Sequence, residues 1–411
     1  MGKNILILST LDERGNGHGW SRVSFFRELG FHVEFICLYR KYSDTDNYII
    51  DSINKLNLGY LWYSFIRFLE KLPFLFSKNV RGLYKGIDFS TASQVLKKTH
   101  NKPDYILLYS YQLFLSPKEI LKLYKKTGAT LIIIMVDEKL LGGGCAYPEW
   151  CDGQGYIDGC RNCPVYPYAK FIPREIFKQK EHYFRQIPFH IVGTQYDINK
   201  IKDIHYLNDK VFHTSVGVPK IPFVKTKKEA RYSFNISEND FVIMAGAVSA
   251  QNRKKGFSEL LESLLIFSNN VIKEKPVTLL ILGNDFNRFC FPSNIKICTP
   301  GFLDLQGLFT AYYACDIYVS PSLLDSGPYM VNYAMACGRP VIAFPVGVAL
   351  DLIIPQQTGW IAKRNDTKDF AKGISLFYGY NQNELTLIEK QCIDHLKSYE
   401  KHPWYEFMLN P

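Results

Sequence analysis

The sequence predicts an α/β protein built from two doubly wound, Rossmann-like domains that face a central cleft. Its 411 residues are enough for two domains of ordinary size. Short apolar runs alternate with helix-like segments along the chain, which is the pattern of a parallel sheet covered by helices. This alternation stops near residue 220 and then begins again. In such folds ligands bind outside the carboxyl ends of the strands, so we expect the functional site in the cleft.

The N-terminal half contains short apolar runs of the kind found in buried parallel strands. These runs predict strands at residues 4–10, 32–38, 104–110, 130–136 and 189–194. Helices are expected at residues 20–29, where Gly30 supplies a stop signal, and at residues 174–185.

The C-terminal half repeats the alternation, with strands expected at residues 241–249, 277–285, 316–322 and 340–347 and a helix at residues 258–267. Between the halves, Pro219, Pro222 and a basic run that starts at Lys220 coincide with a loss of apolar periodicity. We therefore expect an N-terminal domain at residues 1–220 and a C-terminal domain at residues 221–395. Residues 396–411 are expected to form a helix that packs back on the N-terminal domain.

The composition limits the class of protein and of partner. The formal net charge is +10, which suits nucleotide diphosphates or lipid phosphates, and no aromatic motif of the RNA-binding type accompanies it. We therefore expect no nucleic-acid partner. The sequence has no uncharged apolar stretch long enough for a transmembrane helix, and its first apolar run is too short for a signal peptide. This predicts a cytoplasmic protein that works in solution or on the inner face of the membrane. The oligomeric state is not indicated.

One aromatic and basic segment, residues 61–84, has two interpretations. Its apolar side suits peripheral contact with a membrane, with the basic residues at the headgroups. The other interpretation, which we favour, is a pair of core-facing helices broken at Pro73.

The most informative stretch is residues 315–366, where a strand is followed by a polar loop and a helix. The loop carries Asp325, Gly327 and Pro328, and the helix is expected to begin near Tyr329. The first backbone N–H groups of a helix favour anions. A carboxylate just before such an end suits a sugar hydroxyl beside a phosphate, although an ordinary strand-to-helix loop is the alternative.

This stretch resembles the donor-binding core of the family-4 glycosyltransferases, which are retaining enzymes with a GT-B fold. The matching residues are Cys315-Asp316, Pro321-Ser322, Asp325 to Pro328, Ala334 to Pro340, Gly347, Asp351 and Thr358-Gly359. The resemblance implies a hexosyltransferase that uses a UDP-sugar or GDP-sugar and a glycan or lipid-linked acceptor. It implies that Asp325 binds donor hydroxyls and that Gly327, Pro328, Tyr329 and Met330 approach the sugar and phosphate. No D-x-D motif lies in this stretch to suggest a donor-bound Mg²⁺.

The chain departs from the family at one donor position. The family commonly has two glutamates separated by seven residues, and here Asp325 and Tyr333 stand in their places. The second glutamate usually holds the ribose, a role that Asn332 or the Tyr333 hydroxyl would have to take. The same departure resembles a subset of capsule and lipopolysaccharide enzymes. The alternative is a GT-B protein without catalytic activity that binds a glycan or a partner enzyme. An epimerase or a phosphorylase fits the motif order less well.

Two other loops supply candidates for donor and acceptor binding. Arg253, Lys254 and Lys255 follow an expected strand and resemble the family's lysine-glycine segment, where cations offset diphosphate charge. A solvated basic loop is the alternative. After the first strand, Gly17 is a candidate for donor binding and His18 for acceptor or phosphate binding, with a surface histidine as the alternative.

A cysteine-rich loop is expected at residues 142–167, ahead of the helix at residues 174–185. Cys145, Cys151, Cys160 and Cys163 supply the four thiols of a tetrahedral zinc site, with an Fe–S cluster, two disulfides or free thiols as alternatives. The loop resembles an insert in colanic-acid and O-antigen enzymes of family 4. In front of it, Asp137 is a candidate catalytic residue that contacts the acceptor. Alternatively, Asp137 pairs with Lys139 or caps a backbone amide.

Overall fold

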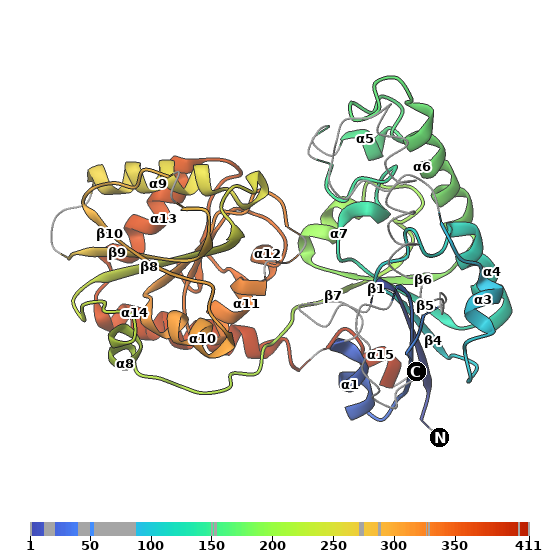
Figure 1. Cartoon of the computed structure of the whole chain (residues 1–411), viewed down its shortest axis with the longest axis horizontal. Coiled ribbons are helices and arrows are strands. Elements are labelled where there is room, and N and C mark those ends of the chain that lie inside the picture. Colours follow the sequence, from blue (N-terminus) through green and yellow to red (C-terminus); the bar gives the residue numbers. More distant parts are fainter. Residues whose placement is uncertain are drawn as a thin grey trace. The chain divides into compact units, whose positions relative to one another are not determined.

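The computed structural model describes residues 2–11, 21–39, 50–52, 88–148, 151, 154–270, 275–286, 289–325, 327, 329–401 and 403–409 (Figure 1). The chain divides into two compact units. The N-terminal unit comprises Met1–Gly193 and Asp197–Thr214, and the C-terminal unit comprises Thr194–Tyr196 and Ser215–Pro411.

The N-terminal unit is a parallel sheet of seven strands in the order β3-β2-β1-β4-β5-β6-β7. The strand order reverses between β1 and β4, as it does in doubly wound folds. The strands are β1 Asn4–Leu11, β2 His32–Tyr39, β3 Ile50–Ser52, β4 Tyr105–Leu108, β5 Thr130–Ile134, β6 Phe189–Gly193 and β7 Val211–Thr214.

Helices of this first part of the chain begin and end at recognisable signals. In α4, the Ser116 side chain caps the first turn by accepting from the Glu119 amide, and Gly128 ends the helix in the left-handed conformation. The helices are α1 Ser21–Glu28, α3 Ala92–Leu96, α4 Pro117–Thr127, α5 Gln154–Ile157, α6 Phe171–Phe184 and α7 Gln195–Ile201, with a 3₁₀ turn, η2, at Glu138–Leu140.

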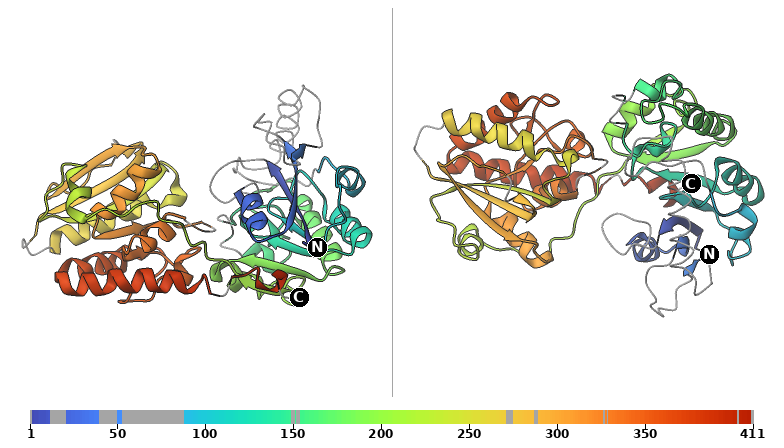
Figure 2. Two further views of the ribbon diagram at one scale, coloured as in Figure 1. Left: turned by 90° about the horizontal axis from the view of Figure 1, so that it is seen from below. Right: turned by 45° about the horizontal axis from the view of Figure 1, so that its top comes forward.

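The C-terminal unit is a parallel sheet of six strands in the order β10-β9-β8-β11-β12-β13. The helices α9 and α13 pack together on one face, while α8, α10, α11 and α14 lie on the other (Figures 1 and 2). The strands are β8 Phe241–Ser249, β9 Val277–Asn284, β10 Ile295–Gly301, β11 Ile317–Ser320, β12 Val341–Ala343 and β13 Gly359–Ile361. The helices are α8 Lys227–Tyr232, α9 Phe257–Asn270, α10 Leu305–Ala314, α11 Tyr329–Ala336, α12 Ala349–Leu352, α13 Thr367–Gly379, α14 Gln382–Ser398 and α15 Glu406–Leu409, with a 3₁₀ turn, η4, at Arg253–Lys255.

The predicted fold class is confirmed, and every strand expected from the sequence is present within a few residues of its expected bounds. The strands that the sequence did not predict are β3, β7, β10 and β13, which are the edge strands of the two sheets. An edge strand has only one neighbour and buries less of its surface. It therefore lacks the continuous apolar run that marks a central strand of a parallel sheet.

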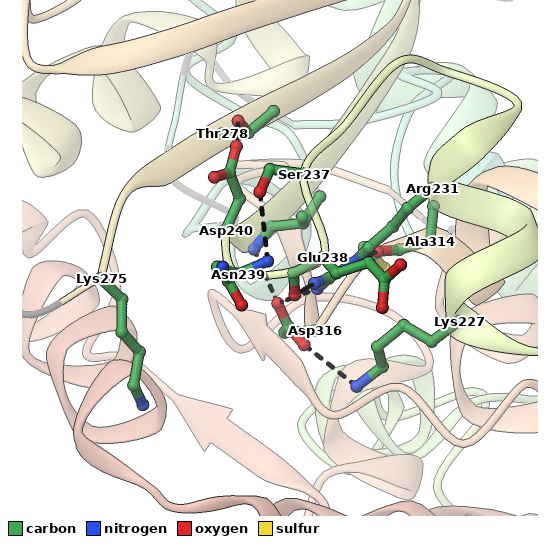
Figure 3. A network of polar contacts seen from close by, with 12 residues as sticks. Lys227, Arg231, Ser237, Glu238, Asn239, Asp240, Lys275, Thr278, Ala314 and Asp316 are labelled. Atoms are coloured by element: carbon green, nitrogen blue, oxygen red, sulfur yellow. Dashed lines mark hydrogen bonds and ion pairs between the residues drawn. The ribbon is translucent and has the colours of Figure 1, made fainter.

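A buried ion pair fixes the amino-terminal edge of the second sheet (Figure 3). The Asp316 carboxylate, 7 % exposed, lies 2.7 Å from the Arg231 guanidinium of α8 and 3.1 Å from the Lys227 ammonium. It also accepts a hydrogen bond of 2.7 Å from the Val242 amide of β8. Arg231 in turn donates to the Ala314 carbonyl at the end of α10. This network joins α8 and α10 to the start of β8 and β11, so Asp316 of the predicted motif has a structural role.

A half-buried carboxylate, that of Asp351 in α12, accepts hydrogen bonds from the Gln195 amide at 3.1 and 3.2 Å. Burial raises the pKa of Asp351 to about 6, and the hydrogen bond from Gln195 opposes part of that shift. Because the folded state holds the proton more tightly than the unfolded chain does, the ionised carboxylate destabilises the fold. This destabilisation is absent at a pH below the ordinary pKa of an aspartate and is fully present above pH 6.

We predict that Asp316→Ala lowers the free energy of unfolding of the C-terminal unit by about 3–5 kcal/mol, because it leaves the buried Arg231 guanidinium without its anion. Urea unfolding followed by circular dichroism measures this loss. The matched control is Lys228→Ala, which removes an exposed partner of Glu238 and should leave the curve unchanged. A loss for Asp316→Ala no larger than that of the control would contradict the structural role.

For Asp351 we predict a stability difference that depends on pH. Asp351→Asn keeps a side-chain acceptor for the Gln195 amide but carries no charge. Its stability relative to the wild type should therefore increase by roughly 1–3 kcal/mol between pH 4 and pH 7. Urea unfolding at several pH values measures the difference, with the exposed Asp209→Asn as control. An Asp351→Asn curve that stays parallel to the wild type across this range would contradict the raised pKa.

Candidate functional site

The loop after β8 approaches the loop after β11 very closely. Gly256 lies just beyond η4 in the left-handed conformation, with φ of 66°. A Cβ atom at this position would lie 1.8 Å from the Pro321 carbonyl oxygen, so no other residue fits without moving the backbone. The Leu323 amide also donates to the Lys254 carbonyl at 2.8 Å. These contacts fix the basic loop against the polar loop that follows β11.

This approach brings Lys255 and Asp325 together although 70 positions separate them in the sequence. The Lys255 Nζ lies 2.7 Å from Asp325 Oδ2, and the two side chains are 34 % and 16 % exposed. The other carboxylate oxygen, Oδ1, accepts from the Gly327 amide at 3.2 Å. The pair lies beyond the carboxyl ends of β8 and β11, which are neighbouring strands. Both the cation and the carboxylate are partly open to solvent. Each can therefore release the other and bind a group of a ligand in its place.

The two other cations of the basic loop are arranged differently. Arg253 is largely exposed and pairs with Glu259 in the first turn of α9. The backbone amide of Lys254 donates to the Asn252 side chain, which caps η4. The structure therefore places Arg253, Lys254 and Lys255 in one turn, where Arg253 pairs with Glu259 and Lys255 pairs with Asp325.

Helix α11 follows the polar loop and presents its first turn at the same edge of the sheet. The Tyr329 ring lies against Gly217, where a Cβ atom would come within 2.9 Å of it. The Met330 methyl group would come within 3.0 Å of a Cβ atom at Gly246 on β8, and the Met330 carbonyl accepts from the Tyr312 hydroxyl. Both side chains therefore contact neighbouring backbone and help to hold α11 in place.

The expectation that the Asn332 side chain holds a ribose is not supported by its surroundings. The side chain is 2 % exposed, and its amide nitrogen donates to the Gly217 carbonyl at 2.6 Å. A ribose would have to break this bond and reach a buried group. Asn332 instead attaches α11 to the segment that precedes the C-terminal sheet.

Tyr333 lies in an aromatic cluster rather than beside a charged group. Its ring centroid is 5.0 Å from that of Tyr329, 5.3 Å from that of Phe309 and 6.3 Å from that of Tyr312. Burial raises the pKa of the Tyr333 hydroxyl, and the neighbouring Tyr329 adds to the shift. The neutral, half-buried phenol cannot supply the negative charge that a glutamate would supply at this position.

Asp137 follows β5 and takes the alternative role that its sequence allows. Its carboxylate caps η2 by accepting from the Lys139 amide at 3.0 Å, and it pairs with the Lys139 ammonium at 2.5 Å. The next residue, Glu138, is 1 % exposed and pairs with Lys200 at 2.5 Å. Both carboxylate oxygens of Asp137 have local partners, as those of Asp325 do, and the side chain is 18 % exposed, so its role as a catalytic residue stays a prediction.

The sequence analysis did not single out Ser249 and Asp285, which stand at the ends of β8 and β9. Asp285 has a φ of 70°, and its carboxylate accepts from the Ser249 hydroxyl at 2.7 Å. Each is the polar last residue of a predicted strand, which is the signal that could have identified them. Gly217 was also missed, because its importance comes from contacts with α11 that are distant in sequence.

Cys145, Cys151, Cys160 and Cys163 line one cavity of about 30 Å³ in the N-terminal unit. None of these four cysteines forms a disulfide in this structure, so the alternative of two disulfides is not found. Burial raises the pKa of Cys145 to about 12 and that of Cys160 to about 11. Within the described residues, no group of three or more Cys, His, Asp or Glu side chains is arranged to hold a metal ion as it stands. The predicted zinc site therefore stays a prediction.

Some predicted features lie outside the described residues. They are Gly17, His18, Pro328 and the aromatic segment at residues 61–84. No helix in the described ranges is long and apolar enough to cross a membrane.

Comparison with known proteins agrees with this architecture. Residues 239–378, which include Lys255, Asp325 and all of α11, match the family model described as "Glycosyl transferases group 1". A relative from Campylobacter jejuni, N,N'-diacetylbacillosaminyl-diphospho-undecaprenol alpha-1,3-N-acetylgalactosaminyltransferase, is 25 % identical over 181 residues, which are 43 % of this chain and 46 % of the relative. The chain spans about half the length of the curated relatives it matches.

Two solved structures show the same fold at low identity. WaaG, a glycosyltransferase involved in lipopolysaccharide biosynthesis, superposes with a TM-score of 0.61 at 12 % identity, over 99 % of this chain and 98 % of WaaG. Anabaena HepE in complex with UDP-glucose gives 0.56 at 13 % identity, over 96 % of this chain and 94 % of HepE. The chain therefore has a GT-B fold, and residues 239–378 of its C-terminal unit match the model of the group 1 glycosyl transferases.

Proposed function

We propose that the protein is a glycosyltransferase that transfers a sugar from a nucleotide-diphosphate sugar to an acceptor. The observation that carries this proposal is the pair of Lys255 and Asp325 at the ends of two neighbouring strands, 2.7 Å apart and partly open to solvent. Both residues lie inside the segment that matches the group 1 glycosyl transferases.

In the proposed complex, Lys255 exchanges its carboxylate partner for the diphosphate of the donor. Negative charge grows on the diphosphate as its bond to the anomeric carbon breaks, so a fixed cation stabilises the transition state more than the ground state. Lys254 and Arg253 extend the positive charge around the same turn. The backbone of Gly327, Tyr329 and Met330 approaches the phosphate, because the N-terminus of α11 favours an anion.

Release from Lys255 leaves the Asp325 carboxylate free to accept hydrogen bonds from hydroxyl groups of the donor sugar. The amide of Gly327 continues to orient the other carboxylate oxygen, so the side chain does not have to be reordered. We propose a UDP-sugar as donor. HepE, a structural neighbour, was solved with UDP-glucose, which supports this choice.

We propose a retaining, family-4 reaction, which the resemblance of residues 315–366 supports. The acceptor attacks the face from which the diphosphate leaves, and the transition state resembles an oxocarbenium ion. The departing phosphate takes the proton of the acceptor hydroxyl, so no strong protein base is needed.

For the acceptor we propose a lipid-linked saccharide. The Campylobacter relative is named for a diphospho-undecaprenol acceptor, and WaaG is described as acting in lipopolysaccharide biosynthesis. The net charge of +10 suits an acceptor that carries lipid phosphate and a site of action at the membrane surface.

A non-catalytic GT-B protein is the second candidate, because Tyr333 and Asn332 offer no carboxylate for the ribose. A donor screen by mass spectrometry separates the two candidates. Release of a nucleoside diphosphate from one donor, with transfer to an acceptor or to water, supports the enzyme. Neither binding nor turnover with any UDP- or GDP-sugar would favour the second candidate.

We predict that Lys255→Ala lowers kcat by roughly 10²–10³-fold, because the growing charge on the diphosphate loses its fixed cation. Steady-state release of the nucleoside diphosphate measures the effect. The matched control is Lys228→Ala, which removes a lysine from an exposed ion pair in α8. A Lys255→Ala enzyme with nearly normal turnover would refute the assignment.

We predict that Asp325→Asn lowers kcat/KM at least tenfold, because an amide replaces a charged acceptor of sugar hydroxyls. The Tm should change little, since the pair with Lys255 is partly exposed. The comparison uses Asp209→Asn, an exposed aspartate of the N-terminal unit. If Asp325→Asn lost activity only in proportion to the protein that unfolds, a role in donor binding would not be supported.

A further inference from the structure

The four cysteines of the segment between η2 and α6 gather although the sequence separates them by up to 18 positions. Their side chains line one enclosed cavity together with Tyr156, Tyr166 and neighbouring glycines and prolines. The cavity of about 30 Å³ is large enough for a single small ion or water molecule. None of the four sulfur atoms is bonded to another.

Backbone N–H groups point at two of these sulfur atoms. The Gly143 amide donates to Cys160 Sγ at 3.1 Å. Cys163 accepts hydrogen bonds from the amides of Val165 and Tyr166, which follow it in the chain. A hydrogen-bond donor of this kind favours a negatively charged sulfur over a neutral thiol. These donors oppose the effect of burial, which raises the pKa of both thiols.

Glycines let the backbone come close to the sulfur atoms. A Cβ atom at Gly155 would lie 3.0 Å from Cys151 Sγ, and one at Gly142 would lie 3.5 Å from Cys160 Sγ. A Cβ atom at Gly143 would lie 2.3 Å from the Pro173 carbonyl oxygen, at the start of α6. The glycines thus permit a compact loop with sulfur atoms inside it, which an ordinary apolar core would not require.

A buried ammonium lies next to the cluster. Lys180 of α6 is fully buried and donates to the carbonyls of Lys139 and Gly142. Those carbonyls carry only partial charge, so they do not offset the cost of burying a full positive charge. An anionic group close to Lys180 would offset it. Four thiolates around a divalent ion carry a net charge of −2, which supplies such a group.

We propose that Cys145, Cys151, Cys160 and Cys163 bind one zinc ion as a structural site. Four sulfur ligands fill the tetrahedral coordination of zinc and leave no position open for a substrate, so the site stabilises the loop instead of taking part in transfer. Because no such group is arranged for a metal ion as the described residues stand, binding requires the side chains to change rotamer, and each change moves a sulfur by about 3 Å. Each thiol releases its proton to solvent as its sulfur binds the metal.

The first test is the metal content of the intact chain, purified in a phosphine reductant without chelators. Elemental analysis should find about one zinc ion per chain. Protein stripped of metal and titrated with Co²⁺ should develop the absorption bands of tetrahedral cobalt with sulfur ligands. A content well below one zinc after loading with ZnCl₂ and dialysis, together with no cobalt bands, would overturn the proposal.

Thiol reactivity and mass distinguish zinc from the other occupants. In the unfolded, reduced protein all ten cysteines should react with an iodoacetamide probe. In the native zinc-loaded protein the four cluster cysteines should be protected, and a zinc chelator should expose them. A loss of two or four hydrogens by mass spectrometry before reduction would indicate disulfides. A visible absorption with bound iron and sulfide would indicate an Fe–S cluster. Either result contradicts the zinc site.

Variants test which cysteines are ligands. Cys160→Ser and Cys163→Ser should each lose zinc and lower the Tm of the N-terminal unit. The matched control is Cys290→Ser, an exposed cysteine of the C-terminal unit, which should retain both the zinc and the Tm. If the ligand variants fail to fold, the cobalt titration of the wild-type protein decides the question. Full zinc retention in both ligand variants would overturn the assignment of these residues.

Discussion

The close approach of two backbones at Gly256 is the constraint on which the candidate site depends. β8 and β11 are neighbours in a parallel sheet, so the loops that leave them begin side by side. The glycine lets the first loop come so close to Pro321 that any side chain there would collide with its carbonyl oxygen. Because the two loops are in contact at this point, the Lys255 ammonium lies within ion-pair distance of the Asp325 carboxylate.

The two ends of the same strands carry different kinds of aspartate. At the amino end, Asp316 is buried and bonded to Arg231, Lys227 and the backbone of β8, and no ligand can replace those partners. At the carboxyl end, Asp325 is partly exposed and its main partner is a flexible lysine. The first carboxylate holds the sheet to its helices. The second carboxylate can exchange its lysine partner for a ligand, as a residue of a binding site must.

The sequence was sufficient for the central parts of the fold because a strand that is covered on both faces must be apolar along its length. It was insufficient for β3, β7, β10 and β13, since an edge strand can be short or polar and still pair with its one neighbour. The position of the candidate site was predictable for a related reason. Polar residues in the loops that leave buried strands, such as Lys255 and Asp325, are expected at the carboxyl edge of the sheet.

The roles of individual side chains were harder to predict, because a role depends on partners that the sequence does not show. Asn332 has the right position and chemistry for a ribose, yet its amide is used by the Gly217 carbonyl from a segment 115 positions earlier. Tyr333 is placed among rings from α10 and α11 that no local pattern brings together. Asp137 differs, because Lys139 is only two positions away and the pairing was foreseeable. A polar residue can be assigned to a ligand only after its contacts within the protein are known. Lys255 and Asp325 stand out because their partly exposed pair lies at the carboxyl edge of the sheet, inside the segment that matches the group 1 glycosyl transferases.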